Sequence, residues 1–190
     1  MNKLTQEYLL ILARRTLESY FQTGAKLAVS ESELPDAELK EERGAFVTLR
    51  KHGQLRGCIG HIEPIQAVYL DVIDNALAAA FDDPRFPRLT HQELAEVEIE
   101  VSVLTKPEKL EYASAEDLLN KLRPLQDGVI LKKGFNSATY LPQVWEDLRD
   151  KQEFLSSLCM KADLPPDEWR SGKLEILTYQ AEVFGEKQDF

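Results

Sequence analysis

The residues of this chain with the clearest capacity for chemistry are gathered in one hexapeptide, Leu55-Arg56-Gly57-Cys58-Ile59-Gly60. The thiolate is the nucleophilic form of cysteine, and a neighbouring guanidinium favours that form. In an extended strand, residues at positions i and i+2 lie on the same face, so Arg56 and Cys58 are expected side by side. The spacing therefore makes Cys58 a candidate catalytic nucleophile, with Arg56 activating it or orienting an anionic ligand.

Gly57 and Gly60 flank this cysteine. Glycine weakens a strand, so its presence indicates a bulge, or the close approach of a ligand or another backbone. In one interpretation, exposed backbone amides at both glycines hold an anion or a carbonyl oxygen together with Arg56. In the other, glycine satisfies the backbone geometry at a bulge and at the end of the hairpin. Both interpretations stay open, and in both the hexapeptide is a candidate pocket floor.

Cys58 also has a structural interpretation. Free cysteine is among the most buried residue types, so packing between two glycines explains it without any reaction. A nucleophilic cysteine normally needs a base, and the near candidates are His52 and His61. His52 is expected in a solvated turn, and the side chain of His61 need not return to the thiol. The constellation is incomplete, so the sequence leaves open whether the protein is an enzyme.

A β-hairpin must position these residues. Residues 46–50 and 55–60 are β-prone runs, and the four residues 51–54 between them form a short turn with a glycine. Apolar residues at helical spacing predict a helix from Pro64 to Phe81, with the proline at its first position. The dipole at the start of that helix would favour an anion near the end of the hairpin.

The remaining elements interleave helices and strands without an internal repeat. We predict helices over 4–27, 114–122, 142–148 and 150–162, strands over 97–103, 128–132, 138–141 and 174–184, a capping box at 90–93, and an extended connector over 30–43. Hairpins dominate the pairing, so the predicted class is α+β. A chain of 190 residues is long enough for one domain with a proper core.

Composition narrows the classes of function. The chain is 43% hydrophobic and 29% charged, as in an ordinary soluble globular protein. Its formal net charge of −10 argues against nucleic acid and anionic membranes as partners. We find no apolar run for a membrane span and no signal-peptide core, so a cytoplasmic protein is expected. Cys58 and Cys159 are expected to be free thiols; no metal site or other cofactor is predicted.

The hexapeptide, preceded by Phe46-Val47-Thr48-Leu49, resembles the signature of the AMMECR-type domain family, also called AmmeMemoRadiSam system protein A. The resemblance continues in order through residues 83–86, 101–107 and 139–145. It implies one AMMECR-type domain over residues 1–190, with a β-sheet covered by helices in a larger lobe and a smaller, more helical lobe. It implies no established reaction. The resemblance does imply a pathway shared with a Memo-like protein and a radical SAM enzyme, which are the expected partners.

The matched segments add two candidate ligand-binding residues. Arg85 can reach a substrate anion, or it can lock its loop onto the sheet through a salt bridge, which is the interpretation favoured here. Thr139 can line the same cleft through its hydroxyl, although threonine is also common in any strand. Phe86 is expected to anchor its loop in the core. Glu98 and Glu100 are interpreted as the solvated face of a strand rather than as an acid–base pair.

The leading hypothesis is therefore a protein that binds a small ligand, or performs Cys58-dependent chemistry, at the hairpin. The candidate ligand-binding residues are Arg56, Gly57, Gly60, Arg85 and Thr139. One alternative is a non-catalytic interaction or regulatory module whose hairpin surface docks a partner chain. Another is regulatory association with nucleic acid, which the net charge of −10 disfavours.

Overall fold

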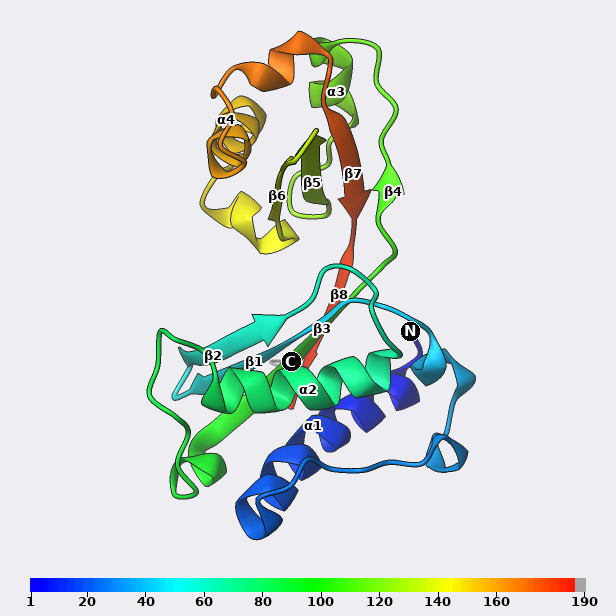
Figure 1. Ribbon diagram of the computed structural model, residues 1–190, viewed down its shortest axis with the longest axis vertical. Helices are drawn as coiled ribbons and strands as arrows, with labels where there is room; N and C mark the ends of the chain where they lie inside the picture. The colour runs from blue at the N-terminus through cyan, green and yellow to red at the C-terminus, as the bar shows by residue number, and fades with distance from the viewer. Residues whose placement is uncertain (187–190) are drawn as a thin grey trace. The chain divides into compact units, whose positions relative to one another are not determined.

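The chain divides into two compact units, each with its own four-stranded sheet (Figure 1). The computed structural model describes residues 1–186. Unit 1 comprises Met1–Leu104 and the segment that begins at Glu182, and unit 2 comprises Thr105–Ala181. Within each unit, helices accompany an antiparallel sheet, so the α+β class predicted from the sequence is confirmed.

Unit 1 is built on a sheet with the strand order β2-β1-β3-β8, in which β1 is antiparallel to both β2 and β3. Its elements are α1 (Lys3–Thr23), the 3-10 turns η1 (Glu31–Glu33) and η2 (Ala37–Lys40), β1 (Ala45–Lys51), β2 (Gln54–Gly60), α2 (Val68–Phe81), the 3-10 turn η3 (Glu93–Glu96), β3 (Val97–Leu104) and β8 (Ala181–Gly185). The predicted hairpin is confirmed as β1 and β2. Its two turn residues, His52 and Gly53, have φ of 52° and 77°, the positive values that a tight hairpin turn requires.

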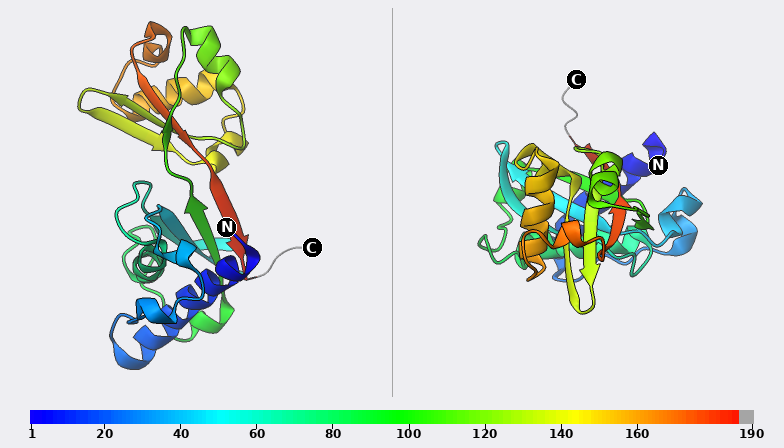
Figure 2. Two further views of the ribbon diagram at one scale, coloured as in Figure 1. Left: turned by 90° about the vertical axis from the view of Figure 1, so that its right-hand side faces the viewer. Right: turned by 90° about the horizontal axis from the view of Figure 1, so that it is seen from above.

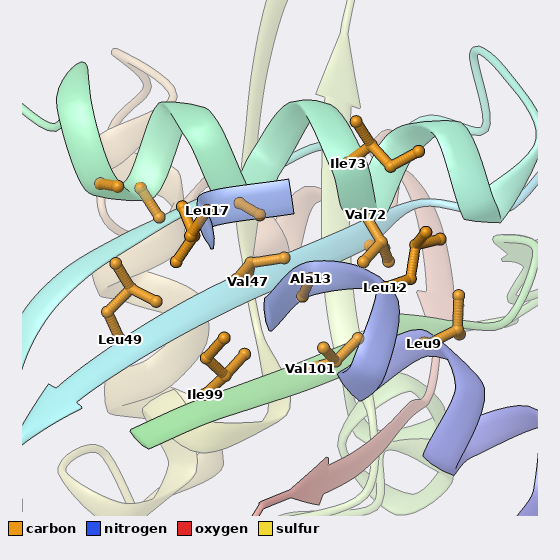
Figure 3. Close-up of a cluster of buried hydrophobic side chains, with 14 of the residues drawn as sticks. Leu9, Leu12, Ala13, Leu17, Val47, Leu49, Val72, Ile73, Ile99 and Val101 are labelled. Carbon is orange, nitrogen blue, oxygen red and sulfur yellow. The ribbon is translucent and has the colours of Figure 1, made fainter. Parts of the chain in front are cut away.

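The core of unit 1 lies between the two long helices and the sheet (Figure 3). Alternation directs Val47 and Leu49 of β1 toward the helices, and both are fully buried. The other members of this cluster include Leu9, Leu12, Ala13 and Leu17 of α1, Val72 and Ile73 of α2, and Ile99 and Val101 of β3. Each fully buried aliphatic side chain contributes about 2 kcal/mol, so this layer fixes α2 on the sheet that carries the hairpin.

Unit 2 is built on a sheet with the strand order β4-β7-β5-β6. Its elements are β4 (Glu108–Lys109), α3 (Ala115–Lys121), β5 (Gly128–Lys133), β6 (Asn136–Tyr140), the 3-10 turn η4 (Pro142–Glu146), α4 (Lys151–Lys161), the 3-10 turn η5 (Glu168–Ser171) and β7 (Glu175–Tyr179). Figure 2 shows α4 lying across this sheet. The rings of Trp145 and Phe154 stack 3.6 Å apart, and Trp169 is fully buried, so both tryptophans are core residues of unit 2.

Three predicted boundaries are wrong, and the helix predicted over 142–148 is instead the 3-10 turn η4 over Pro142–Glu146. Helix α2 begins at Val68 rather than at Pro64, because Ala67 instead forms an isolated bridge with Glu42, and Ile65 is 58% exposed. The predicted strand over 174–184 is two strands, β7 and β8, that belong to different sheets.

The third boundary is the end of the first helix. Helix α1 stops at Thr23, where Gly24 takes a φ of 70° and closes the last turn by donating its N–H to the carbonyl of Tyr20. None of the helices in residues 1–186 is both long and apolar enough to cross a lipid bilayer.

Candidate functional site

Strand β2 is an edge strand of its sheet, and its pairing with β1 is interrupted within the hexapeptide. Leu55 pairs with Arg50, whereas Gly57 pairs with the residue before it in β1, so Arg56 is an extra residue at a β-bulge. A bulge disrupts the regular alternation of side chains. The predicted placement of Arg56 beside Cys58 on one unbroken face is therefore wrong.

Arg56 is instead engaged by a carboxylate in the segment that follows α2. Its Nε and Nη2 each lie 3.1 Å from an oxygen of Glu93, and Nη2 also donates to the carbonyl of Arg88 at 3.4 Å. Thr90 and Glu93 exchange the predicted capping-box hydrogen bonds. The Arg56 guanidinium is the main cause that lowers the pKa of Glu93 to about 2. Because Arg56 is only 9% exposed, it serves chiefly to hold this segment on the hairpin.

This ion pair predicts a loss of stability in acid. The pKa of Glu93 is lowered in the folded protein from its ordinary 4.5 to about 2, so the stability that Glu93 contributes is present above pH 4.5 and is lost as the pH falls to about 2. Glu93→Gln should cost about 2 kcal/mol at neutral pH and should flatten the fall over this range. Urea unfolding of unit 1 at several pH values measures both effects. Glu7→Gln, on the exposed surface of α1, is the control, and equal slopes in the two variants would contradict the assignment.

Three polar groups hold Cys58. Its N–H donates to Oδ2 of Asp83 at 2.9 Å, and its carbonyl accepts from Nη2 of Arg85 at 3.1 Å. Its sulfur lies 3.2 Å from the donating hydroxyl of Thr48, the cross-strand partner on β1. Thr48 is only 6% exposed, whereas Cys58 is partly accessible. The loop after α2 thus occupies the outer backbone N–H and carbonyl of β2 at Cys58, while the thiol stays partly accessible.

Asp83 and Arg85 form the ion pair of that loop. Asp83 is 4% exposed, and it accepts hydrogen bonds from Nε and Nη2 of Arg85 at 3.0 and 2.7 Å. Arg85 is the main cause that holds the pKa of Asp83 well below its usual range, and Asp83 raises the pKa of Arg85 in return. The negative charge of a Cys58 thiolate also raises the pKa of Arg85. Arg85, rather than Arg56, is therefore the cation that contacts Cys58, through its backbone carbonyl.

The two glycines of the hexapeptide are explained by close packing. A Cβ on Gly57 would lie 2.1 Å from the carbonyl oxygen of Ala79 in α2, and one on Gly60 would lie 2.2 Å from Cγ of Phe46. Neither glycine has a positive φ. The close approach of another backbone, one of the reasons weighed from the sequence, accounts for Gly57.

The C-terminal end of α2, and not its N-terminal end, lies beside the cysteine. Gly57 packs against Ala79, and Cys58 bonds to Asp83 just beyond the last turn. The start of α2 therefore lies at the end of the hairpin and does not support an anion at Cys58 itself. At the start of α2, the carboxylate of Asp71 accepts the N–H of Ala45 at 2.9 Å.

Both candidate bases are occupied elsewhere. Nδ1 of His61 lies 2.7 Å from the buried carboxylate of Asp71, and Nε2 of His52 lies 3.0 Å from Glu96. Sequence reasoning missed Asp71 and Asn75, although two polar residues four positions apart on the inner face of an apolar helix were a usable signal. A thiol reaction at Cys58 has neither histidine as its partner among the described contacts.

Thr139 belongs to unit 2 and not to the unit that carries the hairpin. It lies on β6, and its hydroxyl is 3.2 Å from the phenol of Tyr179. The hexapeptide contacts described above all lie in unit 1. The structure therefore shows Thr139 in a different polar environment from Cys58.

Two further expectations have clear outcomes. Phe86 is only half-buried, and the guanidinium of Arg85 lies 5.5 Å from its ring centre, so Phe86 does not anchor its loop in the core. Leu89, which is 3% exposed, is the residue that anchors it. Glu100 pairs with Arg50 across the strands at 3.7 Å, on the face of the sheet opposite the helices.

Unit 1 is a helix-covered sheet with a glycine-flanked cysteine on its edge strand. Unit 2 is a second α+β unit, inserted in the chain before the last strand of that sheet. Together these features define the class of protein. The AMMECR1 family model matches residues 10–184, and the chain belongs to this family. A protein of Methanopyrus kandleri is 42% identical over 96% of this chain and 88% of that protein. A protein of Pyrococcus furiosus is 40% identical over 95% and 88%, respectively.

The fold has also been seen in a solved structure. The crystal structure of an uncharacterised protein from Pyrococcus horikoshii matches this fold with a TM-score of 0.85 at 38% sequence identity. The match covers 98% of this chain and 94% of that one. The likeness thus extends over both units.

Proposed function

We propose that the hairpin of β1 and β2 binds a small ligand at residues 55–60, and that the thiol of Cys58 is the reactive group of this site. The observation that carries this proposal is the hydrogen bond from the buried hydroxyl of Thr48 to the cysteine sulfur at 3.2 Å. A donor to sulfur favours the charged form of the thiol. A cysteine used only to fill space needs no such donor.

The charge near the sulfur supports the same proposal. Arg85 donates a hydrogen bond to the carbonyl of Cys58, and a cation near a cysteine favours the thiolate. The side chain of Arg85 is 54% exposed, so it can also meet an anionic group of a ligand. With no histidine base in place, the chemistry that suits the site is one that needs only the thiolate, such as attack on an electrophilic carbon.

We further propose that this ligand belongs to a pathway shared with a Memo-like protein and a radical SAM enzyme. The family resemblance supports these partners. Replacing Cys58 with alanine in a reconstituted mixture of the three proteins should abolish turnover of the pathway. An unchanged rate would remove Cys58 from the chemistry.

Selective alkylation tests the thiol itself. Cys58 should react with iodoacetamide in the native protein, because its thiol is partly accessible. Cys159 is fully buried, and burial raises the pKa of its thiol, so it should stay unmodified until the protein unfolds. Mass spectrometry of the two peptides over a range of pH values measures both cysteines in one sample. Thr48→Val should slow the labelling of Cys58, with Thr23→Val, at the exposed end of α1, as the control.

The second candidate function is a non-catalytic module that docks a partner chain. The observation that favours it is the position of β2 at the edge of its sheet, where a strand can pair with another chain outside the stretch at Cys58 that Asp83 and Arg85 already occupy. If Cys58 labels no faster than Cys159, the thiol is a packing group, and docking at the hairpin becomes the better account.

A further inference from the structure

A polar cavity of about 270 Å³ lies within unit 2. It is lined by Thr105, Lys106 and Glu108, by Thr178, Tyr179 and Gln180, and by Arg123 and Asp127. None of these residues belongs to the hairpin, and none has a part in the proposed thiol chemistry. The volume suits a small metabolite, since cavities for drug-sized molecules begin at about 300 Å³.

Arg123 is held in a fixed orientation on this cavity. The buried carboxylate of Asp127 accepts hydrogen bonds from its backbone N–H at 2.9 Å, from Nε at 3.1 Å and from Nη2 at 2.6 Å. Its Nη1 has no hydrogen-bond partner among residues 1–186, and the side chain is 55% exposed. A guanidinium that is fixed on one edge and free on the other is a preorganised donor for an anionic oxygen group.

Tyr179 gives the cavity a rigid wall. Its ring is 2% exposed and packs so closely on Gly128 that a Cβ there would lie 2.4 Å from Cζ. Its hydroxyl lies 3.2 Å from that of Thr139 and donates to the carbonyl of Tyr140 at 3.2 Å. Burial raises the pKa of Tyr179 to about 12, so the phenol stays neutral at physiological pH. Thr139 therefore affects the cavity indirectly, because its hydroxyl orients the phenol of Tyr179.

The rim offers charges of both signs. Lys106, on the segment before β4, and Glu108, the first residue of β4, are exposed and two positions apart. Neither has a polar partner among the described residues 1–186, and the hydroxyl of Thr178 opposite Glu108 has none there either. The ammonium of Lys106 and the free edge of the Arg123 guanidinium, whose other edge is paired with Asp127, thus share one small cavity with the carboxylate of Glu108.

We propose that this cavity binds a small zwitterion of the amino-acid type. Its carboxylate lies against Nη1 of Arg123 and the ammonium of Lys106, and its ammonium group lies against the carboxylate of Glu108. Asp127 already balances the charge of Arg123, so a ligand with one charge would leave either Lys106 or Glu108 without an opposite charge. The zwitterion satisfies both.

Titrations of the full-length protein with L-alanine, acetate and methylammonium, followed by NMR, test this proposal. Alanine should shift the Nε–H signal of Arg123 and the amide signal of Thr178, and it should bind about tenfold more tightly than either single-charge probe. Glu108→Gln and Lys106→Gln should each weaken alanine binding about tenfold. Both residues are exposed and unpartnered, so the fold should tolerate these changes. Arg149→Gln, at an exposed arginine of unit 2 outside this cavity, should leave the affinity unchanged.

Three results would overturn the proposal: no shift with alanine, acetate binding as tightly as alanine, or full affinity in Glu108→Gln. Repeating the titration with Cys58→Ala separates this site from the hairpin. Unchanged alanine binding there is expected, whatever the fate of the thiol chemistry.

Discussion

Gly57→Ala is expected to destabilise unit 1 by about 3 kcal/mol, at the upper end of the usual cost of overpacking a core. The new Cβ would lie 2.1 Å from the carbonyl oxygen of Ala79 and 3.1 Å from its carbonyl carbon. These are backbone atoms of α2, so no side-chain rotation relieves the contact, and the strand and the helix must separate. Hydrogen exchange of peptides from β1, β2 and α2 measures the loss within unit 1. Tryptophan fluorescence is unsuitable, because Trp145 and Trp169 both lie in unit 2.

Gly134→Ala is the matched control. Gly134 sits in the turn between β5 and β6 with a φ of 60°, and a Cβ there meets nothing within 4 Å. Its cost is the backbone strain alone, about 1 kcal/mol. If Gly57→Ala costs no more than this control, the close approach of α2 does not explain the glycine, and the interpretation of Gly57 as part of an anion cradle returns.

Local patterns made most of the fold predictable. The alternation of Val97, Ile99 and Val101 predicts β3, and the Asp150 cap predicts the start of α4, because both depend on neighbours within a few positions. The start of α2 was misplaced because a proline permits a helix without requiring one. Residue 67 is instead held by a bridge to Glu42, twenty-five positions away, which no local pattern encodes.

The candidate site was only partly predictable for a related reason. The hexapeptide identifies the cysteine, but the bulge at Arg56 depends on how β2 pairs with β1, and pairing is a tertiary property. The partners of the site, Glu93 for Arg56 and Asp83 for the backbone of Cys58, come from the segment after α2. The sequence shows these carboxylates but not the packing of α2 that brings them back to the hairpin.

Replacing Asp83 should change both the stability of unit 1 and the reactivity of its thiol. Asp83→Ala removes the acceptor for the Cys58 N–H and the partner of Arg85 at once, which should cost about 3 kcal/mol. The wild-type contribution has a defined direction with pH. The pKa of Asp83 is lowered from its ordinary 3.8 in the folded protein, so the contribution is present above pH 3.8 and is lost as the pH falls further. Urea unfolding followed by hydrogen exchange of β2 measures the loss.

The effect on the thiol separates an electrostatic role from a purely structural one. Asp83→Asn keeps a side-chain oxygen for the Cys58 N–H but removes the negative charge that neutralises Arg85. The uncompensated guanidinium should then favour the thiolate and speed alkylation of Cys58 by about threefold or more at pH 7. Arg85→Gln removes the cation and should slow the same reaction.

Faster labelling of Cys58 in Asp83→Asn together with slower labelling in Arg85→Gln would show that the Asp83–Arg85 pair sets the electrostatic environment of the sulfur. A merely structural lock would behave differently, because loosening the loop from either side should expose Cys58 and speed its labelling in both variants. If both variants accelerate labelling, Arg85 guards access to the thiol, and its proposed part in activating Cys58 is wrong.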